Sequence, residues 1–288
     1  MTPSARGRTF GVRSMVAPLM RVAVRPPSSR ADYASAHWTR PLDRDLLQEQ
    51  HARFVVLLER LGCGVEILSE VDGMPDACFV YDPAFVVGSG VIELRAAKTA
   101  RAGEPPLLAV ELQDLGVPVV GRLTAPATAD GGDMCWLDAS TLAVGRSYRT
   151  NQAAHDQLRA MLEPEGVRVE SFDLPHHLGP AFCLHLMSVV SPVRENLAVV
   201  YERLAPVALL QSLAARGVEM VRVPDEEYGS LGCNVLAVAP GVVVMAEGNA
   251  TTAKMLRDHG VEVHSYAASE INKGEGGPTC MTRPLVRG

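Results

Sequence analysis

The chain has 288 residues, of which 47% are hydrophobic and 21% charged, a composition typical of a globular protein with a sizeable core. The net charge of −6 argues against a nucleic-acid-binding protein that relies on a broad basic surface. No apolar run reaches the roughly 18 residues of a membrane span. The six cysteines have no CxxC spacing, and most lie inside apolar runs, which predicts reduced, buried thiols. The close ligand pairs typical of a zinc site are also missing. We therefore expect a soluble, cytoplasmic protein without a metal or other cofactor.

The chain begins with a segment that carries several arginines and no acid, and we interpret residues 1–17 as a flexible tail. Residues 18–288 are expected to form a single domain. Residues 19–27 supply a first apolar strand. Residues 28–45 then form either a lid over a pocket or a plain surface loop.

From residue 46 onward, one pattern recurs five times: a helix-like stretch, a glycine and an alternating apolar strand. The helix-like stretches are residues 46–61, 105–115, 149–163, 205–215 and 250–259. The glycines, each interpreted as a helix C-cap, are Gly64, Gly116, Gly166, Gly217 and Gly260.

A strand–turn–strand pair precedes each of the later helices. These pairs cover residues 77–95, 133–147, 183–201 and 234–248. The sequence therefore predicts an α/β fold of five strand–strand–helix–strand units, which could close around an axis and share one central site. The alternative is an ordinary α/β sheet whose helices happen to end alike.

Polar residues interrupt the apolar pattern near the start of the strand pairs, where a closed ring would bring them together. They are Asp76, Asp82, Asp130, Asp133, His185 and Asn234. Taken singly, each has a structural interpretation, such as a core histidine or a turn. Because burying several ionisable groups is costly, the set as a whole favours a functional site.

Cys280 lies eight residues from the last residue, behind a run rich in glycine and proline. Such a run bends the backbone and leaves room for a close approach. Cys280 is therefore either a small loop residue or a nucleophile presented at a pocket.

Taken together, these segments resemble the pentein superfamily of guanidine-modifying enzymes and, within it, the dimethylarginine dimethylaminohydrolases. The resemblance covers most of the chain and rests on five segments in this order: PDACFVYD (75–82), DGGD (130–133), VGRSYRTN (144–151), LHLMS (184–188) and GGPTC (276–280). It implies a five-fold pseudosymmetric α/β propeller with a central active site, in agreement with the repeat.

The resemblance also implies roles for the residues that match its motifs. Cys280 would be the nucleophile, and His185 the general acid for the departing amine and then the general base for water. Asp130 would orient His185 or hold the guanidinium, and Asp82 would pair with the guanidinium nitrogens. The residues that would bind the amino-acid end of the substrate are Asp76, near the α-amino group, and Arg101 and Arg149, on the carboxylate.

The leading hypothesis is a hydrolase that converts a methylated arginine to citrulline and methylamine or dimethylamine. Tyr81 departs from the family, which usually has a glutamate there, and leaves the second guanidinium contact open. Met187 stands where arginine deiminases usually carry an acid. An arginine deiminase, an amidinotransferase and a non-catalytic binding protein on the same scaffold remain alternatives. The expected partner is a small guanidino compound, with no nucleic acid and no membrane, and a homodimer is compatible with the sequence.

Overall fold

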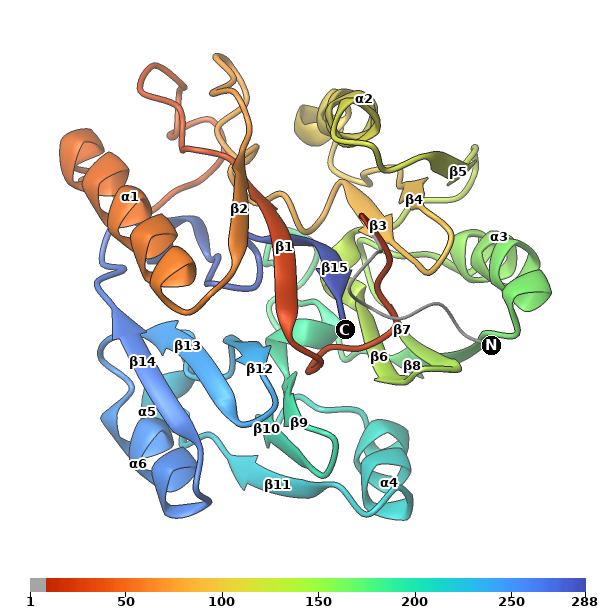
Figure 1. Ribbon diagram of the computed structural model, residues 1–288. Coiled ribbons are helices and arrows are strands. Elements are labelled where there is room, and N and C mark those ends of the chain that lie inside the picture. The colour runs from red at the N-terminus through yellow and green to blue at the C-terminus, as the bar shows by residue number, and fades with distance from the viewer. Residues whose placement is uncertain (1–8) are drawn as a thin grey trace.

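The computed structural model describes residues 9–288 and contains five three-stranded sheets arranged around a central axis. The helices lie on the outside of the ring (Figure 1). In each sheet the central strand pairs antiparallel with one neighbour and parallel with the strand that follows the helix. This arrangement confirms the predicted α/β fold of five repeated units.

The elements follow the repeat along the chain. Unit one comprises β1 (Leu19–Val24), α1 (Arg44–Arg60), β2 (Gly64–Ile67) and β15 (Arg283–Arg287). Unit two comprises β3 (Ala84–Val86), β4 (Val91–Glu93), η2 (Thr99–Arg101), α2 (Glu104–Asp114) and β5 (Val119–Arg122). Unit three comprises η3 (Gly131–Asp133), β6 (Met134–Asp138), β7 (Thr141–Arg146), α3 (Gln152–Leu162), η4 (Glu163–Glu165) and β8 (Arg168–Asp173).

The last two units have the same order of elements. Unit four comprises η5 (Leu186–Ser188), β9 (Val190–Arg194), β10 (Leu197–Val200), α4 (Val207–Ala215) and β11 (Glu219–Arg222). Unit five comprises α5 (Asp225–Tyr228), β12 (Val235–Ala239), β13 (Val242–Ala246), α6 (Ala250–Asp258), β14 (Glu262–Tyr266) and η6 (Ile271–Gly274).

Unit one is completed by the last strand of the chain. β15 pairs antiparallel with β1, so the two ends of the described chain meet in one sheet. The sequence predicted β1 as only part of this unit, and β15 supplies the missing strand. The ring is thus closed by hydrogen bonds between β1 and β15.

Glycines end the helices in the left-handed conformation that residues with a side chain rarely adopt. Gly116, Gly166, Gly217 and Gly260 have φ angles between 70° and 84°, as predicted for C-caps. In unit one, however, the C-cap glycine is Gly62, with φ 88°, and Gly64 is the first residue of β2. The prediction for Gly64 was wrong because both glycines follow the same helix and only the first ends it.

The helices pack through one apolar face. In α3, Leu158 and Leu162 are fully buried, one turn apart. The helix begins at Asn151, whose side chain accepts a hydrogen bond from the amide of Ala154. The same kind of cap begins α1, where Asp43 accepts from Leu46. The helices are therefore anchored by residues visible in the sequence.

The segment before β1 is packed against the ring. Residues 1–8 of the predicted tail lie outside the described residues. Val12, Met15 and Val16 are buried, and Gly11 is bridged to Val286. Residues 11–16 of the predicted tail thus pack against the ring, while the flexibility of residues 1–17 and a single domain over residues 18–288 stay predictions. Among residues 9–288, no helix has both the length and the apolarity to cross a bilayer.

Candidate active site

Residues from all five units line a cavity of about 480 Å³, within the range of small-molecule sites. All seven residues that the sequence singled out for catalysis or substrate binding line it: Asp76, Asp82, Arg101, Asp130, Arg149, His185 and Cys280. The loop of residues 28–45 contributes Ala36 to Thr39 to the wall, where the sequence allowed for a lid. The closed ring thus brings together side chains that lie more than 200 residues apart in sequence.

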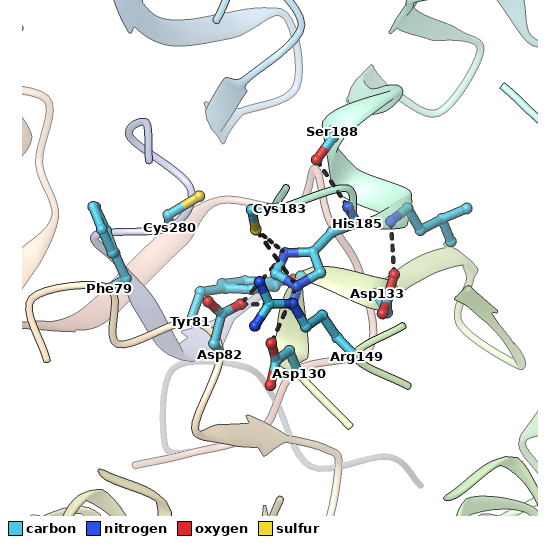
Figure 2. Close-up of polar contacts among 12 residues, drawn as sticks. Phe79, Tyr81, Asp82, Asp130, Asp133, Arg149, Cys183, His185, Ser188 and Cys280 are labelled. Atoms are coloured by element: carbon cyan, nitrogen blue, oxygen red, sulfur yellow. Dashed lines mark hydrogen bonds and ion pairs between the residues drawn. The ribbon is translucent and has the colours of Figure 1, made fainter. Parts of the chain in front are cut away.

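His185 lies between two carboxylates (Figure 2). Its Nε2 is 3.2 Å from Oδ2 of Asp130, and its Nδ1 is 3.9 Å from Oδ1 of Asp82. The first distance is a hydrogen bond and the second is not. Asp130 therefore orients the ring, and Nδ1 is the nitrogen without a close partner among the carboxylates.

The position of the imidazole is also set by Gly132 and Cys183. A side chain at Gly132 would overlap the ring, and its amide donates to Oδ1 of Asp82. The Cys183 sulfur is 3.6 Å from Nδ1 and 3.9 Å from Nε2. Nearly equal distances to both ring nitrogens place the sulfur over the ring face instead of in line with either nitrogen.

The surrounding charges favour a protonated His185. Burial alone would lower its pKa, but Cys183, Asp82 and the hydrogen bond to Asp130 outweigh burial and raise the pKa well above its usual value. Burial would likewise raise the pKa of Asp82, but His185 and Arg101 hold it below its usual value. The site therefore holds an imidazolium between carboxylates.

Cys280 is half-buried, and its sulfur accepts a hydrogen bond of 3.2 Å from the side chain of Asn234. The amide oxygen of Asn234 accepts in turn from the backbone of Thr279, at 3.1 Å, which fixes the orientation of the side chain. Burial and the charge of Asp82 raise the pKa of the Cys280 thiol to about 11, against the effect of Asn234. Cys280 is therefore a neutral thiol at neutral pH.

Arg101 lies in the cavity wall, but protein acceptors occupy its guanidinium. Its Nε and Nη2 donate to Glu104 at 2.9 and 2.7 Å, and its Nη1 donates to Asp82 at 2.7 Å. Glu104 lies three residues after Arg101, so this pair was visible in the sequence. The contact of Arg101 with a substrate carboxylate stays a prediction.

Two other cations line the cavity. Lys98 Nζ is 3.0 Å from Oδ2 of Asp76, whose Oδ1 accepts from the indole of Trp38 at 2.9 Å. Arg149 forms no ion pair within residues 9–288, and its buried Nε has no hydrogen-bond partner there. Lys98 and Arg149 are thus better placed than Arg101 to meet an anionic group.

The two acids of the DGGD segment have different surroundings. Asp130 faces the cavity, whereas Asp133 lies behind it and accepts from Ser147 at 2.6 Å and from the amide of Leu186 at 2.9 Å. Burial raises the pKa of Asp133 to about 6. Asp133 therefore joins units three and four and does not line the site.

Cys183 and Lys98 line the cavity and were not predicted. Cys183 lies in the apolar run AFCLHLM, which predicts a buried thiol, and its place two residues before His185 was the only available signal. Lys98 lies in a loop without a recognisable pattern. The three-dimensional structure is needed to recognise both residues as part of the cavity lining.

Asp82, Asp130 and His185 present three potential metal-ligand atoms within 4.8 Å of one another. Two carboxylates and an imidazole can bind a divalent cation such as Zn²⁺. Here a charged His185 and Arg101 already neutralise the carboxylates, and a metal would have to displace the proton from His185. The absence of a metal stays a prediction.

Both departures from the family pattern are explained by side-chain position. The Tyr81 hydroxyl donates to the carbonyl of Met134 at 3.3 Å, and its ring packs under Arg283, so its polar end points into the core. Met187 is buried and lines the cavity. The cavity thus has a thioether where deiminases usually have a carboxylate.

Comparison with known proteins agrees with this geometry. Residues 205–287 match the arginine deiminase family. An arginine deiminase of Listeria monocytogenes is 30% identical over 75% of this chain and 62% of its own length. The uncharacterised protein YkgA of Bacillus subtilis is 30% identical over 83% of this chain and 80% of its own length.

Two solved structures share the fold. Dimethylarginine dimethylaminohydrolase of Pseudomonas aeruginosa, in complex with citrulline, has a TM-score of 0.76 at 22% identity, over 93% of this chain and 100% of its own. The chain therefore has the fold of the pentein superfamily. The N-terminal domain of ArgZ, a cyanobacterial arginine dihydrolase, has a TM-score of 0.81 at 18% identity, over 93% of this chain and 98% of its own.

The match to the deiminases covers only part of their length. The chain spans about 62% of the arginine deiminase from Listeria. Arginine deiminases are thus similar to this chain in sequence, and a dimethylarginine dimethylaminohydrolase is similar to it in fold.

Proposed function

We propose that this pentein hydrolyses the guanidino group of an arginine derivative through a covalent intermediate on Cys280. The observation that carries the proposal is one cavity lined by a thiol, Cys280, and by the Asp82–His185–Asp130 cluster. A guanidinium is planar and cationic, and carboxylates bind it through charge-assisted hydrogen bonds. Asp82 and Asp130 supply such carboxylates, and Arg149 and Asp76 line the same cavity and are available for the amino-acid end.

Substrate binding favours the reactive form of the nucleophile. Burial and Asp82 raise the pKa of Cys280 to about 11, and the substrate cation stabilises the thiolate, so the thiol proton passes to solvent as the substrate binds. The thiolate attacks the central guanidino carbon and forms the C–S bond. His185 gives its proton to the departing amine as the C–N bond breaks, which leaves an S-alkyl thiouronium on Cys280.

Water completes the cycle. His185, now neutral, takes a proton from the water that attacks the thiouronium carbon. As the C–S bond breaks, the sulfur returns as a thiolate, the second proton of the attacking water passes to solvent, and the neutral ureido product leaves. Asp130 keeps the ring oriented in both steps through its hydrogen bond to Nε2, while Nδ1 exchanges the protons.

For the substrate, we propose a methylated arginine. Met187, two residues after the catalytic histidine, gives the cavity an apolar side chain, which favours an N-methyl group over an unsubstituted nitrogen. The second candidate is arginine itself, favoured by the 30% identity with arginine deiminases. An amidinotransferase would share the first half-reaction, with an amine in place of water.

The proposal is tested by assaying ureido product from asymmetric dimethylarginine, monomethylarginine and arginine separately. We expect citrulline from the methylated substrates, none from the Cys280→Ser variant, and retained activity in the control Cys63→Ala, since Cys63 lies outside the cavity. Citrulline from arginine alone would assign a deiminase. No citrulline from any of the three would contradict the proposal and favour transfer to an amine or a binding role.

A further inference from the structure

An ion pair of opposite charges lies in the cavity wall, outside the catalytic cluster. Asp76 and Lys98 are joined at 3.0 Å, and Trp38 fixes the other oxygen of Asp76. An ammonium has three donors, and this contact is the only hydrogen bond of Lys98 Nζ within residues 9–288. The Lys98 side chain is 28% exposed, so its remaining donors are accessible.

The pair is separated from the catalytic cluster by one side chain, Arg101. The Nη1 of Arg101 contacts Asp82, and its Nη2 lies 3.5 Å from the carbonyl of Asp76. A ligand with its guanidino group at Asp82 would therefore extend along Arg101 toward Asp76 and Lys98. Arg101 itself stays bound to Glu104.

We propose that Lys98, paired with Asp76, determines specificity for substrates with an α-amino-acid end. This inference rests on the proposed function. The substrate ammonium binds Asp76 and the substrate carboxylate binds Lys98, so each charge of the zwitterion faces its opposite. A decarboxylated amine brings only its positive charge, which Lys98 repels.

The test measures binding by calorimetry in full-length protein that carries Cys280→Ser, with L-arginine and its decarboxylated analogue agmatine as probes. We expect Lys98→Met to weaken L-arginine binding roughly tenfold, because a hydrogen bond between charged groups is lost. Agmatine binding should stay within about twofold or become tighter. Lys98→Arg should restore most of the affinity for L-arginine, and Lys254→Met, on the exposed face of α6, should change neither.

Equal losses for both ligands, or no loss for L-arginine, would overturn the inference. Thermal unfolding of each variant shows whether a loss of affinity for L-arginine reflects misfolding. The Lys98→Arg variant keeps the positive charge, so it tests in a folded protein whether that charge binds L-arginine. The ureido assay on the wild-type protein separates the proposed hydrolase activity from the proposed role of Lys98. If the wild type forms citrulline but Lys98→Met binds L-arginine normally, only the role of Lys98 is overturned. If L-arginine binding depends on Lys98 but the wild type forms no citrulline, only the hydrolase activity is overturned.

Discussion

The proposed reaction depends on the protonation of two side chains, Cys280 and His185. The pKa of Cys280 is raised to about 11 and that of His185 lies well above its usual value, so the cavity is lined by a neutral thiol and an imidazolium. Asn234, which donates to the sulfur, is the side chain that favours the thiolate.

Replacing Asn234 should move the pH dependence of the enzyme. We expect kcat/KM to rise with pH from neutral to alkaline, since this parameter reports the free enzyme and its thiol must ionise. In Asn234→Leu the whole rise should be displaced to higher pH, because the thiolate loses its donor, so kcat/KM at a given pH on the rising limb should be lower than in the wild type. The measurement is kcat/KM from pH 7 to about 10. The exposed Asn196→Leu serves as control, and an equal or higher kcat/KM along the rising limb in Asn234→Leu would contradict the argument.

Gly132 is required by the close approach of the backbone to the imidazole. A methyl group there would overlap the ring and displace it from Asp130. We expect Gly132→Ala to lower kcat/KM by about a hundredfold, as small displacements of catalytic groups do, without a large change in Tm. Gly229 also lines the cavity, but a methyl group there meets no atom within 4 Å. Gly229→Ala should therefore retain activity, and equal losses in both variants would argue against this role of Gly132.

At the scale of elements, Asp133 joins two units of the ring. It belongs to η3 of unit three and binds the first amide of η5 in unit four, the turn that follows His185. Burial raises its pKa from a usual value near 3.8 to about 6, so the folded protein favours the neutral form. Below pH 4 both states are protonated, and above pH 6 both are ionised. Between these values only the unfolded chain ionises, so stability falls as pH rises.

Asp133→Asn should remove this pH dependence. The free energy of unfolding of the variant, relative to the wild type, should increase between pH 4 and 6 by up to roughly 3 kcal/mol. The hydrogen bonds lost in the variant add a cost that is the same at every pH and does not affect this change. Urea titrations at several pH values measure this difference. A difference that does not change with pH would show that Asp133 is ionised in the folded protein throughout this range.

The sequence predicted those features of the elements that depend on residues close together in the chain. Each helix, its C-cap glycine and the next strand are encoded locally, and the repeat made them recognisable. The choice between Gly62 and Gly64 could not be made, because both lie just after α1. The packing of Val12 and Met15, like the contact of Cys183 with His185, depends on residues distant in sequence and has no local signal.

At the scale of the whole molecule, one strand holds the ring together. β15 completes the sheet of unit one, and its arginines reach both neighbouring units. Arg283 donates to the carbonyls of Tyr81 and Ala84 in unit two, and Arg287 donates to the carbonyl of Ala237 in unit five. The sequence predicted the five units, but this closure pairs residues more than 250 positions apart and had no signature.

Arg283 should therefore contribute more to stability than an arginine of a surface ion pair. It is buried, lies 4.1 Å from the centre of the Tyr81 ring, and has no carboxylate partner within residues 9–288. In Arg283→Met the carbonyls of Tyr81 and Ala84 lose their donor and stay buried, at about 1–3 kcal/mol each. Removing a buried charge offsets part of that loss, so we expect a net decrease of about 2–4 kcal/mol in urea unfolding.

The matched control is Arg146, whose guanidinium forms an exposed ion pair with Asp173. Arg146→Met should cost less than about 1 kcal/mol, because water replaces the exposed pair. If Arg283→Met were no more destabilising than Arg146→Met, the contacts of β15 with unit two would not stabilise the closed ring. The active site would then be held together by the sheets of the individual units and the hydrogen bonds between their loops, such as that of Asp133 with Leu186.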